Sequence, residues 1–293
     1  MLYILLSIIC SSILVLLFRV FQNHKVDTFQ AIYFNYFTCV ASAWVSLGAF
    51  PIPSDLTSKN WFPYALILGL VFITGFNAVA GTVSKFNVAL ASVMQKMTII
   101  FVVIFSIFFY KESASWQKIL GVILSIVAIL FTSYTPDNQE NTKEKKTTLM
   151  DWILFPVAAL VLSAVIDILL LYLQKSMNTG GTDISFIASL FASAGSIGTV
   201  YFAYALATKR MTFEWKNVLA GITLGVPNFA SIYYLLKAID VNKDGSVVFP
   251  LVNVGIIVVS TLAAWLVFKE QLTKYKTIGV LMAIAAIFLI AYS

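Results

Sequence analysis

Two charged side chains, Lys96 and Asp167, lie inside long apolar segments of this sequence. An ionisable group in the interior of a membrane costs at least about 2.5 kcal/mol, so it normally faces a partner or a cavity. Three kinds of chemistry fit: a structural ion pair between the two, binding of a charged solute by either, or proton uptake and release by Asp167. At about 1.5 Å per residue, the depths of the two residues should differ by roughly 10 Å, a gap that side-chain reach can close.

Uncharged amide side chains recur at similar places in other apolar segments. Gln95 falls on Asn253 when the two halves of the chain are compared, and Asn77 resembles Asn228, each about one turn into its segment. Two interpretations stay open. The amides line a polar central cavity that binds a solute, or they form hydrogen bonds between helices and contact no solute.

Aromatic side chains offer a further set of candidates. Tyr33 and Tyr36 share one helix face at a spacing of i, i+3, and Tyr234 lies in the same segment as Asn228. These tyrosines are candidates for the wall of the cavity, although most aromatic residues in such segments face lipid or the membrane interface.

Composition identifies the elements that must hold these residues. Apolar residues make up 60% of the 293 residues and charged residues only 11%, against roughly 25% in a soluble domain. Ten segments carry at most one charge each and are long enough to cross a hydrocarbon core of roughly 30 Å as helices. The sequence therefore predicts an all-α integral membrane protein with ten transmembrane helices, near residues 2–18, 29–54, 61–84, 86–110, 119–136, 152–174, 184–208, 217–236, 245–268 and 277–293.

Charge and cysteine usage exclude several functions. The net charge of +6 comes from Lys and Arg in short loops, where they set topology and contact lipid headgroups, so no nucleic-acid partner is expected. Cys10 and Cys39 fall inside predicted helices, so neither a disulfide nor a metal site is expected. His24 is the only histidine and no carboxylates cluster, which argues against a membrane enzyme, and no cofactor is expected.

One passage of the sequence occurs twice, at a spacing of 158 positions from Lys111 to Lys269. The repeated residues are Lys111-Glu112 and Lys269-Glu270, Gly121-Val122 and Gly279-Val280, and Ala128-Ile129 and Ala286-Ile287. Because each half holds five helices, an odd number, the second half should enter the membrane in the opposite orientation. We therefore predict two inverted five-helix repeats, residues 1–135 and 152–293, joined by a hydrophilic linker at 136–151.

Structural roles are expected for the residues that match best between the repeats. The lysine of each turn, at a helix C-terminus, and the glutamate, at the N-terminus of the next helix, should complement the helix dipoles. The glycines that follow should permit close helix contact. Gly221, Gly225, Gly195 and Gly198 lie in the middle of predicted helices and are interpreted as packing faces rather than phosphate loops.

The chain resembles the drug/metabolite transporter (DMT) superfamily and, within it, the ten-helix EamA-like family. The residues that carry the resemblance are the two Lys-Glu turns, each followed by the pattern G-V-(x)3-I-x-A-I, and the segment Asn228–Ala238. The small multidrug relatives carry a membrane-embedded glutamate in their first helix, and its absence here argues against proton-coupled multidrug efflux. The resemblance implies cytoplasmic termini, whereas the excess of Lys and Arg in the loops after odd-numbered helices implies the opposite, so the orientation stays open.

Together these features predict a secondary transporter that moves small polar metabolites by alternating access, with an anionic or zwitterionic solute such as an amino acid attracted by Lys96. The expected partners are a small-molecule substrate and the lipid bilayer of the plasma (inner) membrane, while proton coupling and a homodimer stay open. A membrane channel or a non-transporting membrane sensor is the alternative. The candidate substrate-binding residues are Lys96, Gln95, Asn77, Asn228, Asn253, Tyr33, Tyr36 and Tyr234, and the candidates for proton coupling or an ion pair are Asp167 and Lys96.

Overall fold

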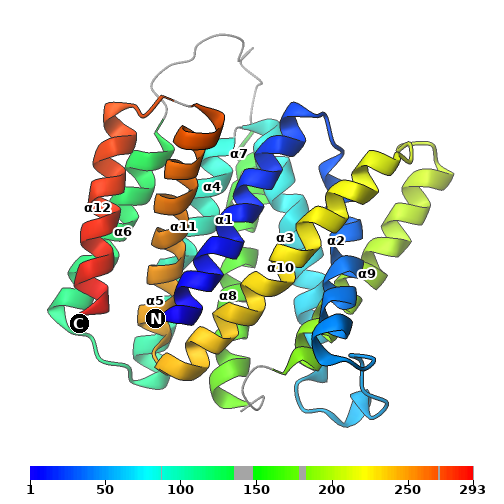
Figure 1. Ribbon diagram of the computed structural model, residues 1–293, viewed down its shortest axis with the longest axis horizontal. Helices are drawn as coiled ribbons and strands as arrows, with labels where there is room; N and C mark the ends of the chain where they lie inside the picture. Colours follow the sequence, from blue (N-terminus) through cyan, green and yellow to red (C-terminus); the bar gives the residue numbers. More distant parts are fainter. Residues whose placement is uncertain (87, 135–147, 178–182, 270, 293) are drawn as a thin grey trace. The chain divides into compact units, whose positions relative to one another are not determined.

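The structure is a computed structural model of the 293-residue chain, and it describes residues 1–86, 88–134, 148–177, 183–269 and 271–292. These residues form helices and connecting loops and contain no strand (Figure 1). Most of the predicted linker and Glu270 of the second Lys-Glu turn lie outside the described residues. The helices are α1 (Leu2–Asn23), α2 (Thr28–Leu47), η1 (Leu56–Ser58), α3 (Phe62–Lys85), α4 (Val88–Lys96), α5 (Thr98–Tyr110), α6 (Trp116–Ser133), α7 (Leu149–Trp152), η2 (Ile153–Val157), α8 (Ala158–Ser176), α9 (Ile184–Ala207), α10 (Trp215–Asn242), α11 (Gly245–Phe268) and α12 (Lys274–Ala291).

Nine helical runs in the described part of the chain are long and apolar enough to cross a membrane, where ten were predicted. The difference is α2, which covers most of the predicted span 29–54. Its polar residues, among them the buried Gln30 and Asn35, make it less apolar than the others. It also ends early, because Gly48 closes it in the left-handed conformation at φ 69 and Pro51 and Pro53 follow.

Two predicted spans are not uniform helices. The span at 152–174 begins with α7 and the π-helix η2, which contains Pro156, before α8 continues. Proline has no backbone N–H, so the regular helical hydrogen-bond pattern changes there. The span at 86–110 is divided into α4 and α5 at Met97.

The chain forms two compact units, and each contains segments from both predicted repeats. Unit 1 consists of Met1–Ile73 and Leu169–Lys243, and unit 2 of Thr74–Ile168 and Asp244–Ser293.

Glycines bring the helices of unit 1 into close contact. A Cβ atom on Gly221 of α10 would lie 2.5 Å from the Phe34 Cβ of α2, and one on Gly225 would overlap Thr38. In α9, a Cβ on Gly195 would lie 3.3 Å from Phe37. The predicted packing role of these glycines is therefore confirmed.

A second helix pair in unit 1 repeats this arrangement. A Cβ on Gly69 of α3 would overlap Ser193 and approach the Ala194 backbone of α9. A shift of 156 positions takes Gly69 to Gly225 and takes Thr38 to Ala194. Contacts of α3 with α9 therefore match those of α10 with α2, a correspondence that the sequence comparison does not reveal.

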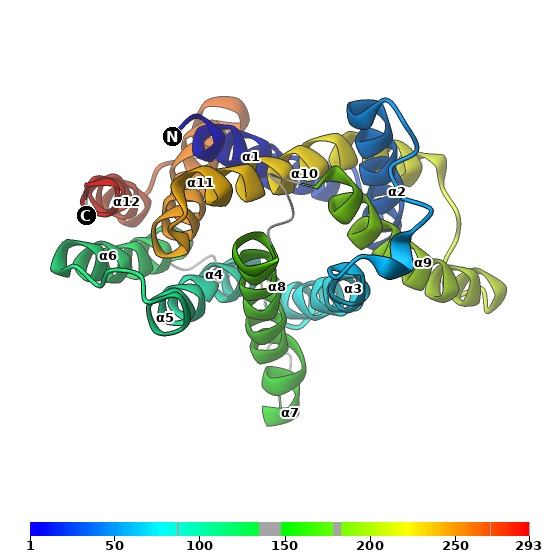
Figure 2. The same cartoon turned by 90° about the horizontal axis from the view of Figure 1, so that it is seen from below.

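In unit 2, α6 and α12 lie side by side and run in opposite directions (Figures 1 and 2). Gly121, near the start of α6, faces Ala286 and Ile290 near the end of α12. Gly279, near the start of α12, faces Ala128 and Thr132 near the end of α6. The fifth predicted helix of one repeat is thus antiparallel to the fifth helix of the other.

Candidate functional site

The fourth predicted span is broken next to Lys96, one of the two charged candidate residues of unit 2. Helix α4 ends at Lys96 and α5 begins at Thr98, with Met97 between them. The Ile100 N–H donates to the Met97 carbonyl at 3.2 Å, the tighter i to i+3 pattern of a 3₁₀ turn. The Thr98 hydroxyl lies 3.0 Å from the Gln95 carbonyl oxygen, a local bond that competes with regular helix geometry.

Lys96 is held by a neutral side chain. Its Nζ donates to Asn253 Oδ1 of α11 at 3.1 Å. The Asn253 amide in turn donates to the Phe249 carbonyl at 3.1 Å, which orients its oxygen toward the ammonium group. The comparison of repeats that aligned Gln95 with Asn253 therefore located the helix pair correctly, although Lys96 rather than Gln95 makes the contact.

Asp167 is also held by a neutral side chain. The Thr98 hydroxyl lies 2.7 Å from Asp167 Oδ2, and Thr98 itself is fully buried. Because Thr98 is two residues from Lys96, the two charges lie within about 3 Å of the same depth, less than the expected offset.

Lys96 and Asp167 lie close enough for their opposite charges to attract each other. Within the described residues they make no direct ion pair; Lys96 bonds Asn253 and Asp167 bonds Thr98. Two opposite charges therefore lie near one depth, and each bonds a neutral side chain.

A second ionic cluster in unit 2 was not predicted. The Lys118 side chain is 1% exposed and donates to Asp244 Oδ2 at 3.0 Å, Ser246 Oγ at 2.9 Å and Ser113 Oγ at 3.3 Å. All three of its N–H donors are thus satisfied. Burial opposes the charge of Asp244. Hydrogen bonds involving Glu112, Ser246 and Lys118 outweigh this effect and lower the pKa of Asp244 to about 2.

The glutamate of the first Lys-Glu turn caps a different helix from the one expected. Glu112 accepts the N–H groups of Gly245 at 2.9 Å and Ser246 at 2.8 Å, at the N-terminus of α11. The next helix, α6, is capped instead by Ser115. The expected interaction with a helix dipole is therefore correct in kind, but it joins segments that are far apart in the sequence.

The amide of Asn228 lies in unit 1. Its Nδ2 donates to Asn35 Oδ1 of α2 at 3.1 Å, and the buried Cys39 thiol lies 3.3 Å from the Gly225 carbonyl. Asn35 is fully buried and was not among the predicted site residues. Asn77, which the sequence comparison matched to Asn228, belongs to unit 2 and is exposed there.

The candidate tyrosines also belong to unit 1. Tyr33 stacks on Phe202 of α9 at a centroid distance of 4.4 Å, and its hydroxyl lies 3.1 Å from Thr199 Oγ1. Tyr36 is fully buried beside Phe191 of α9. These contacts pack α2 against α9.

Tyr234 stacks on Tyr3 of α1 at 6.3 Å. The Lys237 ammonium group lies 5.3 Å from the neighbouring Tyr233 ring and 5.7 Å from the Tyr3 ring. Tyr234 is therefore part of an aromatic contact between α1 and α10 that also holds the Lys237 ammonium group.

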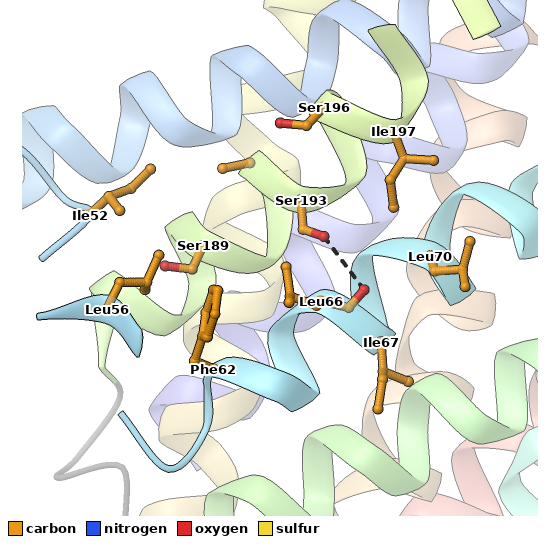
Figure 3. A pocket seen from close by; sticks show the side chains of 11 residues that line it. Ile52, Leu56, Phe62, Leu66, Ile67, Leu70, Ser189, Ser193, Ser196 and Ile197 are labelled. Atoms are coloured by element: carbon orange, nitrogen blue, oxygen red, sulfur yellow. Dashed lines mark hydrogen bonds between the residues drawn. The ribbon is translucent and has the colours of Figure 1, made fainter. Parts of the chain in front are cut away.

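An open apolar groove of about 550 Å³ also lies in unit 1, between α3, α9 and the segment before α3 (Figure 3). Phe62, Leu66 and Ile197 are among its lining residues. The Ser189 and Ser193 hydroxyls donate to the carbonyls of Ser185 and Leu66, so both already have acceptors. None of the candidate substrate-binding residues lines this groove.

The described residues contain no group of three or more His, Cys, Asp or Glu side chains placed to hold a metal ion.

Comparison with known proteins gives three findings. Residues 1–134 match the EamA-like transporter family. A Haemophilus influenzae protein described as uncharacterized is 26% identical over 294 residues, which cover 99% of this chain and 97% of that protein. A solved crystal structure, described only as that of a protein, has a TM-score of 0.74 at 13% identity over 99% of this chain and 96% of that one, so the two share a fold.

Proposed function

We propose that this chain, whose residues 1–134 identify it as a member of the EamA-like transporter family within the DMT superfamily, is a secondary transporter of small polar metabolites. It is a multi-pass membrane protein. We place it in the plasma (inner) membrane, with amino-acid-like, zwitterionic or anionic solutes as its cargo.

The arrangement of Lys96 and Asp167 carries this proposal. Lys96 offers a cation for the carboxylate of a solute, and Asp167 offers an anion for its ammonium group. Each now bonds a neutral side chain, so a charged group of the solute can replace that partner. Separating a direct buried ion pair would cost considerably more. Asn253 serves to orient Lys96, and the exposed Gln95 and Asn77 contact the solute as it passes.

The remaining candidates have a supporting role in this proposal. The contacts of Tyr33, Tyr36 and Asn228 within unit 1 hold its helices together. Tyr234 does the same for α1 and α10.

In many transporters, alternating access is the movement of one inverted repeat against the other, and we propose that this chain has such repeats, with α2 as the tenth membrane helix. The antiparallel packing of α6 and α12 supports the inversion, because these helices occupy the same place in the two repeats. The matched contacts of α3 with α9 and of α10 with α2 support it independently.

Uptake into liposomes tests the function. Purified protein is reconstituted, and the uptake of labelled amino acids, nucleosides and organic acids is measured. We expect saturable uptake of an amino-acid-like solute, lost in Lys96→Met and retained in Lys216→Met, a control that removes an exposed cation. Uptake that is unchanged in Lys96→Met rejects the role of this residue, and a sustained ion current without saturable uptake favours a channel.

A further inference from the structure

The Thr98 hydroxyl has more acceptors beside it than it can serve. Its Oγ1 lies 2.7 Å from Asp167 Oδ2 and 3.0 Å from the Gln95 carbonyl oxygen. A hydroxyl group has one proton to donate, although it can accept two hydrogen bonds. One full-strength hydrogen bond can therefore reach only one of these oxygens at a time. Because Thr98 is fully buried, its hydroxyl proton is shared between these two oxygens and not with water.

The protonation state of Asp167 decides which oxygen receives the bond. An ionised carboxylate can only accept, so Thr98 then donates to Asp167 and not to Gln95. When Asp167 binds one proton from the aqueous phase, a new O–H bond forms on its carboxyl group, which becomes the donor to Thr98 Oγ1. The Thr98 proton is then free to rotate to the Gln95 carbonyl. The only bond formed is that O–H bond, and every group keeps a partner.

We propose that Thr98 transmits the protonation of Asp167 to the break between α4 and α5. Lys96 and Met97 are the two residues between Gln95 and Thr98, so the bond from Thr98 to Gln95 closes a turn around the candidate cation. With Asp167 protonated that turn is closed, and with Asp167 ionised it loses this bond. A single ordinary hydrogen bond shifts such a balance by roughly fivefold.

The charged surroundings of Asp167 are simple enough for this mechanism. Among the described residues, Lys96 on α4 is the charged side chain that acts on Asp167. The contacts from α5 and α11 come from Thr98 and Asn253, which do not titrate. Lys96 donates to Asn253 and lies inside the turn that the bond from Thr98 to Gln95 closes.

This inference rests on the proposed function for its use in transport, but its test needs no solute. The purified full-length protein is titrated in lipid nanodiscs. Infrared absorption of the protonated carboxyl follows Asp167, with Asp167→Asn as the reference that lacks the band. Hydrogen exchange of the peptide 95–100 follows the turn, corrected for the intrinsic effect of pH.

In the wild type, we expect exchange at 95–100 to change by roughly fivefold across the pH range where the band titrates. The response should vanish in Thr98→Val, which keeps the shape but lacks the hydroxyl, and persist in Thr98→Ser. Thr82→Val is the matched control, because Thr82 is also fully buried and donates to a backbone carbonyl, that of Ala78. This control should keep the response.

Three results would overturn the proposal. The Asp167 band does not titrate, exchange at 95–100 does not follow the titration in the wild type, or Thr98→Val keeps the response while Asp167 still titrates. The failure of the proposed function gives a different pattern. A protein that couples normally but moves no solute rejects transport alone, and a protein that transports without coupling rejects the role of Thr98 alone.

Discussion

Gly121 of α6 and Gly279 of α12 make the same contact from opposite sides of one helix pair. Gly121 faces Ala286 and Ile290, and Gly279 faces Ala128 and Thr132. Each of these partners is 158 positions from its counterpart, the spacing of the two glycines themselves. The duplicated sequence thus forms a two-fold related contact, with Gly needed at both close approaches.

The two glycines should respond differently to a methyl group. A Cβ on Gly279 would lie 2.8 Å from the Thr132 backbone nitrogen, whereas one on Gly121 would lie 2.6 Å from Ile290 Cγ1. A side chain can rotate away but a helix backbone cannot. Gly279→Ala should therefore destabilise the protein by about 1–3 kcal/mol. Gly121→Ala should lower the stability by less. Thermal unfolding in detergent measures both losses. Equal losses would show that the Ile290 side chain cannot move.

The left-handed lysines at the repeat turns should tolerate glycine. Lys111 and Lys269 end their helices at φ 56 and φ 53, a conformation that costs an L-residue roughly 1–2 kcal/mol. Lys111→Gly should raise the free energy of unfolding by about 1 kcal/mol, measured by thermal or denaturant unfolding. The control Lys216→Gly, at a helical position, should lower it. A loss of stability in Lys111→Gly would mean that the lysine side chain has a necessary partner.

The cluster around Lys118 should make stability depend on pH only in strong acid. The folded pKa of Asp244, about 2, lies below its ordinary value of roughly 3.9. Such an acid contributes stability that is fully present above its unfolded pKa and lost as the pH falls through its folded pKa. The difference in melting temperature between wild type and Asp244→Asn should be constant from pH 7 to about 4.5 and shrink between about 4 and 2.

The matched control for this experiment is Asp55→Asn. The pKa of Asp55 is also lowered, mainly by a hydrogen bond from Lys59, but the pair is exposed. Exposed ion pairs contribute little to stability, so this variant should melt like the wild type at every pH. A difference for Asp244→Asn that persists unchanged at pH 2 would contradict the assignment of the ionised acid.

Asp167 should discriminate between solutes rather than support transport in general. Asp167→Asn keeps the shape and an acceptor for Thr98 but removes the anion proposed to bind an ammonium group. Uptake of an α-amino acid should fall roughly tenfold or more, the effect of losing a charge-assisted hydrogen bond. The same acid without its amine should be taken up nearly as before. Equal losses for both solutes would mean that Asp167 has a structural role and does not bind the ammonium group.

Much of the fold could be predicted because charge marks the ends of membrane helices. The predicted spans 184–208 and 245–268 differ from α9 and α11 by a residue at most. Polar helices are harder to predict. Helix α2 buries Gln30 and Asn35 within unit 1, and the same two side chains make the helix less apolar. Tertiary packing decides such cases.

Contacts around the candidate site could be predicted where a repeat relates the residues, and they were missed where they join unrelated positions. The alignment of Gln95 with Asn253 located the partner helix of Lys96. Lys118 falls between the predicted spans 86–110 and 119–136, and nothing local indicates that Asp244, 126 positions away, would neutralise it. The similarity of Asn77 and Asn228 was misleading, since a spacing of 156 places Phe72, not Asn77, opposite Asn228.

Ligand stabilisation of the purified protein tests the central claim most directly. A solute that binds the folded state raises the melting temperature progressively with its concentration. For an amino-acid-like solute, we predict a rise in the wild type and in Lys216→Met, and no rise in Lys96→Met, which should melt normally without ligand. Equal stabilisation of Lys96→Met and wild type by the same solute would contradict the account, because the solute would then bind without the Lys96 cation.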